Sequence, residues 1–373
     1  MTIGIVGGGQ LGRMMALAGY PLGLDFLFLD RSADTPAAQV APTLVGEFTD
    51  RKLLRELARR SEVITFDWEN VSIESLRALG RSASIAPPLA ALAMSQDRVA
   101  EKKLFGKLAI PTTRHAAVDS QASLVRALRD IGLPGVLKTR RLGYDGKGQA
   151  VVRSIEDAWL ALERLRGAPL IYEEFVPFDY EVSIIGARNC HGEVVVYPLN
   201  RNLHRDGILR LTRAPWGAPA LQRQAAAHLR RVLEHFRYEG VLNIEFFVRG
   251  GRLLANETAP RVHNSGHFSR GAARVSQFDL HWLAIAGQLP GDLGVAPAFG
   301  MRNLLGPWEV EGAVVRAPND LPGERGLWYG KSRVSSGRKV GHLVASGRDA
   351  QEIDGILQEF ERWELTFWST FNR

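Results

Sequence analysis

The sequence predicts a mixed α/β and α+β fold, with an open parallel α/β domain at the N-terminus, two middle lobes and a small C-terminal lobe. The chain has 373 residues, which is too long for one ordinary compact core. Its N-terminal part alternates short apolar runs with helical stretches, a pattern typical of β-α-β units. Further on, apolar runs are joined by hairpin-like turns, which indicates antiparallel strands.

Residues 1–97 are expected to form the open parallel domain. The expected strands and helix are IGIVG, FLFLD, EVITFDWEN and RKLLRELARRS. The stretch SASIAPPLAALAMSQDR is expected to be turn-rich and to close this domain, because two adjacent prolines neither continue a helix nor pair in a sheet.

Three segments follow: a small lobe over 98–176, a large lobe over 177–294 and a C-terminal lobe over 295–373. The expected elements of the small lobe are the helix VAEKKLFGKL and the strands GVLKT, AVVR and LIYEEFV. Those of the large lobe are the strands EVSIIGAR, EVVVYPL, NIEFFV and RLLANE and the helix ALQRQAAAHLRRVLEHF. The last lobe is expected to carry short strands and to end in an amphipathic helix that begins near Asp349.

Composition favours a soluble protein of the cytoplasm. Hydrophobic residues make up 45% and charged residues 23%, no apolar run reaches the length of a membrane span, and no secretory signal precedes the first strand. The single cysteine, Cys190, excludes an internal disulfide. The net charge of +7 raises the question of nucleic acid, but basic and acidic residues alternate and form no basic stripe. We therefore expect small phosphorylated ligands, and neither nucleic acid nor a membrane as partner.

The glycine turn Gly7–Gly12 follows the first expected strand and fits the G-x-G-x-x-G pattern of dinucleotide-binding proteins. Asp30 ends the next apolar run, where the ribose-binding carboxylate of an NAD site is expected. This stretch alone favours a dehydrogenase, so the rest of the chain has to decide the class.

A second glycine-rich loop lies between two expected strands of the small lobe. Lys138 stands near the end of the first strand, and Gly143, Gly146 and Gly148 follow it. Such glycines let backbone N–H groups approach phosphates closely, and a lysine neutralises them, which indicates a nucleotide lid. The alternative is a flexible hairpin with a solvated lysine.

The stretch NIEFFVRGGRLLANE predicts a hairpin that turns at Gly250 and Gly251. A two-residue turn places Glu245 opposite Asn256, with Glu257 on the other face, whereas an odd-length turn or a bulge brings the two glutamates together. Two carboxylates and an amide oxygen on one face suit Mg²⁺. The alternative is a pair of solvated charges at strand ends.

The stretch PRVHNSGH gathers hydrogen-bond donors in a glycine-containing turn: Arg261, His263, Asn264, Ser265 and His267. This density suits an oxyanion, which Arg261 would hold bidentately. The spacing of the two histidines also invites a zinc interpretation, but the glutamate of the helical zinc motif is absent. Further on, the basic residues Lys331, Arg338 and Lys339 surround a turn, and they are either anion ligands or ordinary surface charges.

Taken in order, these motifs resemble those of the ATP-grasp enzymes. The ones that carry the resemblance are QDR, LKT with GYDGKGQ, YEEFV, Glu181, NLHRDG, NE and PRVHNSGH. More narrowly, the chain from GGGQLGRM to YGKSRVSSGRKVGH is similar to the 5-(carboxyamino)imidazole ribonucleotide synthase family of purine biosynthesis. The resemblance implies a homodimeric ligase that uses ATP and Mg²⁺ to carboxylate 5-aminoimidazole ribonucleotide with bicarbonate, through carboxyphosphate. The amine captures either carboxyphosphate itself or the CO₂ that carboxyphosphate releases in a closed pocket, and the sequence leaves both open.

The resemblance also implies where ATP and the metal bind. The expected nucleotide ligands are Arg98, Lys138, Gly143, Tyr144, Asp145, Gly146, Lys147, Gly148, Gln149, Glu173, Glu174, Phe175, Val176, Glu181, His204, Asn256 and Glu257. Among them, Arg98 and Lys138 would meet phosphates, residues 173–176 would bind adenine through their backbone, and Glu181 would bind the ribose. Glu245 and Glu257 would bind Mg²⁺.

The resemblance implies that the glycine turn and the helix after it bind the ribonucleotide and not NAD, since the 5'-phosphate of the ribonucleotide is an anion like a pyrophosphate. The expected substrate contacts are Gly9, Gln10, Leu11, Glu69, Asn70, Tyr144, Arg261, His263, Asn264, Ser265, Lys331 and Arg338. The expected catalytic residues are Asp145, Arg261, His263 and Lys331, with Asp145 orienting the attacking amine.

One stretch, FDWEN, departs from the family pattern at Asp67 and Trp68, where relatives often carry glutamate and a small apolar residue. We therefore carry no ligand contact over to Asp67. Two alternatives stay open: another ATP-grasp ligase or a formyltransferase acting on a related ribonucleotide, and a nucleotide-binding module without catalysis.

Overall fold

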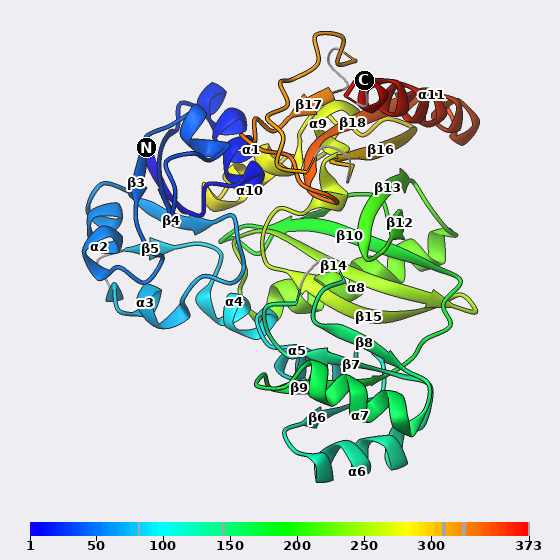
Figure 1. Ribbon diagram of the computed structural model, residues 1–373. Coiled ribbons are helices and arrows are strands. Elements are labelled where there is room, and N and C mark those ends of the chain that lie inside the picture. The colour runs from blue at the N-terminus through cyan, green and yellow to red at the C-terminus, as the bar shows by residue number, and fades with distance from the viewer. Residues whose placement is uncertain (81–82, 144–145, 308–310, 323–325, 372–373) are drawn as a thin grey trace.

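The structure, a computed structural model, describes residues 1–80, 83–143, 146–307, 311–322 and 326–371. The described residues form three sheets, and Figure 1 shows the small lobe and the C-terminal helix at opposite ends of the molecule. This arrangement confirms the predicted mixed α/β class with an open parallel sheet at the N-terminus.

The N-terminal sheet has five parallel strands in the order β3-β2-β1-β4-β5. They are β1 (Thr2–Val6), β2 (Asp25–Asp30), β3 (Thr43–Val45), β4 (Val63–Phe66) and β5 (Ser84–Ile85). The connecting helices are α1 (Gln10–Gly19), α2 (Arg51–Arg59) and α3 (Ile73–Arg77), with 3-10 turns at η1 (Tyr20–Leu22) and η2 (Ala37–Gln39). Asp50 caps α2 by accepting from the N–H groups of Lys52 and Leu53, which fixes where that helix begins.

The segment expected to be turn-rich contains a helix, α4 (Leu89–Ser95), so that prediction was too broad. Pro88 is the N-cap of this helix, a position that needs no intrahelical N–H bond. The two prolines therefore stop a helix from starting earlier and do not prevent one from following them.

The small lobe is a four-stranded antiparallel sheet with the order β6-β9-β7-β8. Its strands are β6 (His115–Val118), β7 (Gly135–Thr139), β8 (Gln149–Val152) and β9 (Leu170–Glu174); its helices are α5 (Arg98–Lys107), α6 (Gln121–Ile131) and α7 (Ile155–Arg164). Leu137 and Tyr172 pack under α6 and α7. Because side chains alternate along a strand, Val136, Lys138 and Glu173 face the other way, into the space between the lobes.

A nine-stranded sheet runs through both the large lobe and the C-terminal segment, in the order β15-β14-β10-β12-β13-β16-β18-β17, with β11 paired to β10. The strands are β10 (Tyr180–Arg188), β11 (Val194–Val196), β12 (Asn200–Arg205), β13 (Ile208–Ala214), β14 (Gly240–Arg249), β15 (Arg252–Ala259), β16 (Ala298–Leu305), β17 (Gly326–Trp328) and β18 (Lys339–Gly347). The chain boundary predicted near residue 295 does not interrupt this sheet, because β13 pairs with β16. The four predicted segment bounds stay a prediction.

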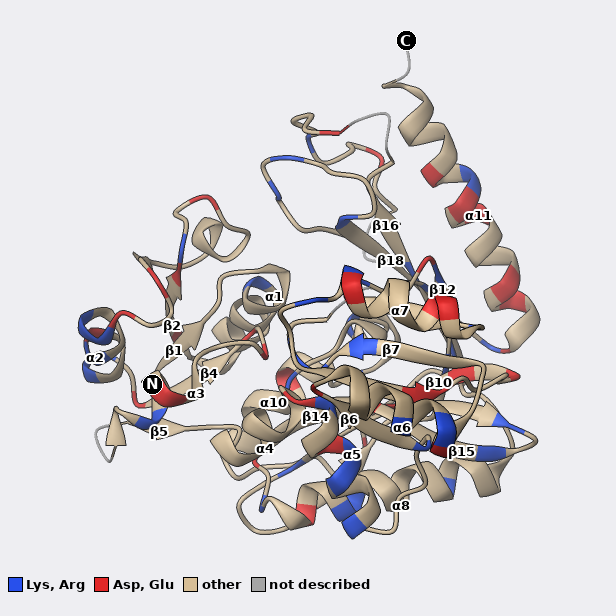
Figure 2. Cartoon of the chain, turned by 60° about the horizontal axis from the view of Figure 1, so that its bottom comes forward, with Lys and Arg blue, Asp and Glu red and all other residues tan. Residues whose placement is uncertain are grey.

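Helices cover this large sheet. They are α8 (Pro219–His235), α9 (Ser269–Ala272), α10 (Gln277–Ile285) and α11 (Ala350–Ser369). Asp349 caps α11, where the amphipathic helix was expected to begin. Acidic residues predominate along α11 and basic residues along α2 (Figure 2). Helix α10 joins the two larger units, since Trp282 packs on α1 and donates to the Met15 carbonyl at 2.8 Å. Among the described residues, none of the helices has the length and apolar character to cross a membrane.

Candidate active site

The register of the β14–β15 hairpin brings Glu245 and Glu257 together. Gly250 and Gly251 both have positive φ (54° and 73°) and form a two-residue turn, with Arg249 opposite Arg252. A bulge then shifts the pairing, so that Phe246 lies opposite Ala255 and Glu245 lies opposite Glu257. Asn256 is the extra residue of the bulge. Of the alternatives left open by the sequence, the bulged register is the one found.

Contacts from α5 hold the bulged strand in place. Glu101 accepts from the backbone N–H of Thr258 at 2.6 Å and from its hydroxyl at 2.7 Å. Lys102 donates to the carbonyls of Ala255 at 3.1 Å and Asn256 at 3.0 Å. Each of these two charged side chains is 1% exposed, so each is buried with its hydrogen bonds made. Neither residue was predicted from the sequence, although their spacing from Phe105 places both on the buried face of the helix.

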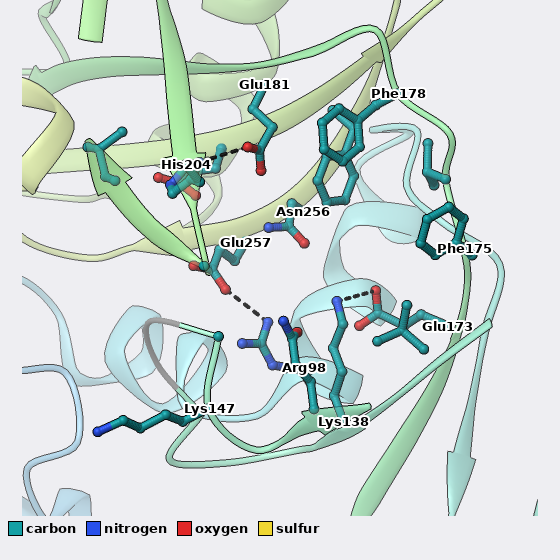
Figure 3. Close-up of a pocket in the computed structure, with 18 of the residues that line it drawn as sticks. Arg98, Lys138, Lys147, Glu173, Phe175, Phe178, Glu181, His204, Asn256 and Glu257 are labelled. Carbon is teal, nitrogen blue, oxygen red and sulfur yellow. Dashed lines mark hydrogen bonds and ion pairs between the residues drawn. The ribbon is translucent and has the colours of Figure 1, made fainter. Parts of the chain in front are cut away.

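A cavity of about 320 Å³ lies between the small lobe and the large sheet (Figure 3). From the small lobe, Arg98 donates to Glu257 at 2.9 Å and Lys138 donates to Glu173 at 3.1 Å. On the opposite wall, His204 Nδ1 lies 2.7 Å from Glu181 Oε2. The predicted nucleotide residues Gly146, Lys147, Gln149, Glu174, Phe175, Val176 and Asn256 also line this cavity. Thus the small lobe contributes the basic groups together with β9 and the segment after it, and the large sheet contributes the carboxylates opposite them.

Burial and neighbouring basic side chains together set the pKa values of two carboxylates in this cavity. Burial raises the pKa of Glu173, but Lys102, Lys138 and Arg98 outweigh burial and hold the pKa well below its usual range. Burial likewise raises the pKa of Glu257, and Arg98 more than reverses this shift. Both carboxylates are therefore ionised and keep the basic groups fixed in the cavity wall.

Glu245, Glu257 and Asn256 fit a hard cation. Burial and the neighbouring carboxylates of Glu257 and Glu181 raise the pKa of Glu245 to about 8, against the opposing charge of His204. The Asn256 side-chain oxygen is buried and has no hydrogen-bond partner among the described residues. The described residues hold no group of three His, Cys, Asp or Glu side chains suited to a metal. A cation held by two carboxylates would thus need further oxygens, as Mg²⁺ takes from phosphates.

Two phenylalanines that were not predicted from the sequence form one wall of the cavity. Phe178 and Phe247 stack with ring centroids 4.8 Å apart. Phe178 lies near Phe175 of the segment that follows β9 (Figure 3). A flat apolar surface of this kind suits a purine ring. Phe247 shares a face of β14 with Glu245, so strand periodicity would have indicated it.

The glycine-rich loop crosses to the large sheet. Gly146 (φ +76°) approaches the β12–β13 turn so closely that a Cβ there would lie 3.2 Å from the Asp206 carbonyl oxygen. Gly148 (φ +73°) packs on Thr139 in the same way, at 2.6 Å. Positive φ and close approach both require glycine at these positions. Tyr144 and Asp145, which were predicted to contact the substrate, lie outside the described residues.

A second cavity, of about 270 Å³, adjoins the first. It is lined by the predicted substrate residues Gln10, Leu11, Glu69, Asn70, Arg261, His263 and Asn264, with Gly143, Arg140 and Arg141. Both side-chain polar atoms of Asn264 are buried and have no partner among the described residues. Five residues line both cavities: Arg98, Glu257, His263, Asn264 and Lys339. Molecules in the two cavities would therefore meet along a common wall.

The remaining predicted substrate residues lie elsewhere. Lys331 donates to the Lys339 carbonyl at 2.6 Å and Arg338 to the Arg333 carbonyl at 2.9 Å, and of this basic group it is Lys339 that lines the two cavities. Ser265 is buried beneath His263, within hydrogen-bond distance at 2.9 Å. Gly9 lines a separate recess with Asp67. Side chains in a turn do not alternate with a fixed period, so the sequence could not predict which of Lys331, Arg338 and Lys339 lines the cavities.

The N-terminal glycine turn is filled by the chain's own carboxylates. Asp30 accepts from the N–H of Gly8 at 2.7 Å, and Asp67 accepts from those of Gly9 at 2.6 Å and Gly12 at 3.3 Å. A Cβ at Gly7 (φ +101°) would lie only 1.8 Å from the Asp67 carboxylate. The N–H groups of all three glycines thus already have acceptors, which argues against a pyrophosphate lying on the glycine turn as it does in a dehydrogenase.

Asp67 should make folding stability depend on pH. Burial raises its pKa to about 7, against the opposing N–H groups of Gly12 and Gly9. An unfolded aspartate has a pKa of about 3.9. Between these values the folded state binds a proton that the unfolded state lacks, so the free energy of unfolding falls as pH rises. Relative to wild type, Asp67→Asn should gain about 1 kcal/mol per pH unit between roughly pH 5 and 7.

Chemical denaturation at pH 5, 6, 7 and 8 measures this difference. Asp34→Asn, at an exposed position of the same unit, is the matched control and should follow the wild type. A stability difference between Asp67→Asn and wild type that stays constant over this range would contradict the buried, proton-binding role of Asp67.

Comparison with known proteins identifies the family. A family model described as ribonucleotide synthetase preATP-grasp domain matches residues 1–96, one described as ATP-grasp domain matches 103–278, and one described as phosphoribosylaminoimidazole carboxylase C-terminal domain matches 300–355. N5-carboxyaminoimidazole ribonucleotide synthase of Pseudomonas aeruginosa is 43% identical over 361 residues, covering 97% of this chain and 99% of the relative. The chain belongs to the N5-carboxyaminoimidazole ribonucleotide synthase family.

Solved structures of this family share the fold over nearly the whole chain. The Thermus thermophilus synthetase superposes with a TM-score of 0.89 at 43% identity, covering 96% of this chain and 98% of that one. The Aspergillus clavatus synthase, solved in complex with ADP and 5-aminoimidazole ribonucleotide, superposes with a TM-score of 0.87 at 26% identity, covering 97% and 98%. The predicted family and fold are confirmed, and the chain is an ATP-dependent ligase of the ATP-grasp type.

Proposed function

We propose that the chain joins bicarbonate to the exocyclic amine of 5-aminoimidazole ribonucleotide, giving 5-(carboxyamino)imidazole ribonucleotide, ADP and phosphate. The observation that carries this proposal is the common wall of the two cavities, formed by Arg98, Glu257, His263, Asn264 and Lys339. Because the two cavities adjoin at these residues, an ATP-derived intermediate formed in the first cavity would have only a short path to an acceptor in the second. The relative from Aspergillus clavatus holds ADP and 5-aminoimidazole ribonucleotide together, which supports the same pair of ligands here.

We place ATP in the first cavity. Phe178 and Phe247 would hold the adenine, with hydrogen bonds from the backbone of residues 173–176. Glu181, already paired with His204, would accept from the ribose hydroxyls. Arg98 and Lys138 would contact the phosphates, and the loop at Gly146–Gln149 would close over them. Glu245, Glu257 and Asn256 would hold Mg²⁺, which when bound neutralises charge on the phosphates.

The reaction then has two steps. An oxygen of bicarbonate attacks the γ-phosphorus, the bond to ADP breaks, and carboxyphosphate forms. The amine nitrogen attacks the carboxyl carbon, the carbon–oxygen bond to phosphate breaks, and the nitrogen loses a proton. Arg261 and Lys339 would hold the negative charge of bicarbonate and its phosphate ester while the cavity walls limit hydrolysis by water.

We place the ribonucleotide in the second cavity. The first-turn N–H groups of Gln10 and Leu11 have no acceptor within α1 and would bind its 5'-phosphate. Glu69, Asn70 and Asn264 would contact the ribose and the base. Lys331, Arg338 and Ser265 stay proposed contacts, as do Tyr144 and Asp145. The predicted homodimer and cytoplasmic location also stay predictions.

A coupled assay of ADP release tests the proposal. Turnover is expected only when ATP, Mg²⁺, bicarbonate and 5-aminoimidazole ribonucleotide are all present, and each is left out in turn. Equal turnover with glycinamide ribonucleotide would move the assignment to a ligase for another ribonucleotide. ATP binding without ADP release under any combination would leave a non-catalytic nucleotide-binding module as the better description.

A further inference from the structure

A buried chain of polar side chains runs beneath His263, from the middle of the large sheet to the turn η4 (Asn264–Gly266). Its members come from β10, β12, β13 and η4, and each is between 0% and 3% exposed: Ser183, Asn200, Asn202, Thr212 and Ser265. They lie behind the common wall and do not line either cavity, so they do not contact a ligand directly. Buried polar groups of this kind need their hydrogen bonds made in one consistent order.

That order is set at Ser183. Its oxygen accepts from the side-chain NH₂ groups of Asn200 at 2.7 Å and Asn202 at 2.9 Å. These two donors occupy both lone pairs of the Ser183 hydroxyl. Its one hydrogen must therefore be donated onward, to the Ser265 hydroxyl oxygen at 2.8 Å.

The orientation of the two amides follows from their own contacts. The Asn202 side-chain oxygen accepts from the Thr212 hydroxyl and from the Asn200 NH₂ group, each at 3.2 Å. Turning both amides over would place two carbonyl oxygens against Ser183, which has a single hydrogen to give. The arrangement with both NH₂ groups on Ser183 gives partners to both NH₂ groups and to the Asn202 oxygen, and it leaves the Asn200 side-chain oxygen without a partner among the described residues.

The same direction continues to the imidazole of His263. The Ser265 hydroxyl, having accepted from Ser183, lies 2.9 Å from His263 Nδ1 with its hydrogen free to donate. The backbone N–H of Ser265 also points at Nδ1, at 3.3 Å, and an N–H group can only donate. Nδ1 is therefore an acceptor, and in the neutral ring the proton resides on Nε2. Nε2 faces the cavity side, 3.6 Å from Glu245 Oε1.

We propose that Ser183, Asn200 and Asn202 are positioning residues that hold His263 as its Nε2–H tautomer, so that it donates a hydrogen bond to the anion at the common wall. The proposal rests on the proposed function, in which that anion is bicarbonate or the carboxyphosphate made from it. It assigns His263 the role of a fixed donor, and it excludes this ring as the base that takes the proton of the amine. A fixed donor needs no reorganisation when charge develops on the oxygen that it contacts.

The ring tautomer is measured directly by NMR on the whole chain labelled with ¹⁵N-histidine. Two-bond nitrogen–proton correlations distinguish Nε2–H from Nδ1–H, and the signals of His263 are identified by their loss in His263→Gln. We expect the Nε2–H pattern in the wild type. A Nδ1–H pattern there would overturn the proposal, whatever the activity of the enzyme.

Ser183→Ala tests the relay. Without Ser183 the Ser265 hydroxyl is free to turn, so we expect a mixed tautomer pattern for His263. We expect kcat to fall by about tenfold, less than the roughly hundredfold that loss of an oriented oxyanion donor costs, with KM for ATP unchanged. Thr65→Val is the matched control, since Thr65 is a buried hydroxyl 3.3 Å from His281 in the N-terminal sheet. It should lower stability without changing either readout.

An unchanged ring pattern of His263 in Ser183→Ala would overturn the relay, whether kcat stays at the wild-type value or falls. A lower kcat with an unchanged ring pattern would assign the loss of activity to packing. Failure of the proposed function is a separate result. If the wild type releases no ADP with bicarbonate and 5-aminoimidazole ribonucleotide, the reaction is wrongly assigned, while the ring pattern still decides the tautomer.

Discussion

Glu257→Gln is expected to lower ADP release by about a hundredfold while the protein stays folded, because a lost ligand to the phosphate-bound metal costs several kcal/mol in phosphoryl transfer. The loss has two sources. A neutral amide is a weaker ligand for Mg²⁺ than a carboxylate, and Arg98 loses the charged partner that it contacts at 2.9 Å. Initial rates measured over a range of Mg²⁺ concentrations should show a higher metal requirement together with the lower maximal rate.

Glu234→Gln is the matched control, because Glu234 is an exposed glutamate on α8, on the other face of the large sheet. It should keep wild-type rates and metal dependence. Wild-type turnover by Glu257→Gln, with an unchanged Mg²⁺ requirement, would contradict the assignment of Glu257 as a metal ligand and with it the site built on the bulged hairpin.

Arg261→Lys is expected to lower turnover with 5-aminoimidazole ribonucleotide and bicarbonate by about a hundredfold, because a lysine cannot reproduce the planar, two-pronged contact of a guanidinium with an oxyanion. Arg261 lines the second cavity, where its Nε donates to Glu69 at 2.5 Å. One edge of the guanidinium is thus fixed by Glu69. ADP binds in the first cavity in our proposal, so its affinity should stay unchanged.

Steady-state kinetics with varied ribonucleotide and calorimetric titration with ADP separate these effects. Arg274→Lys serves as the control, since Arg274 is exposed and pairs loosely with Asp292 at 3.7 Å. An Arg261→Lys enzyme that keeps full turnover, or one that loses affinity for ADP to the same degree as activity, would show that Arg261 does not act at the acceptor side of the wall.

Local signals in the sequence were sufficient for many elements. The strand GVLKT is β7 residue for residue. Side chains alternate between the two faces of this strand, and Lys138 is on the face that lines the cavity. The long helix of the large lobe was expected one residue from where α8 begins and ends. These features depend on neighbours within a few positions of the chain, so the sequence alone defines them.

Other features were ambiguous because their partners are far away in sequence. Asp67 fills the glycine turn 58 positions away, as its contact with Gly9 shows. This contact explains why the G-x-G-x-x-G pattern appears here without a dinucleotide. Likewise, the choice of Lys339 among three neighbouring basic residues depends on how the start of β18 lies against the cavity.

The sequence by itself determined the family, the class of fold, and the residue types that line the two cavities, because long motifs and side-chain periodicity are properties of contiguous chain. Tertiary structure alone decided that Glu245 and Glu257 face one another. That pairing depends on one extra residue, Asn256, which forms the bulge. The buried side chains of Glu101 and Lys102 bind the backbone at the bulge, and they come from a helix more than a hundred residues earlier in the chain. The hairpin sequence is compatible with the register with a bulge and with the register without one, and the helix that packs against the hairpin selects between them.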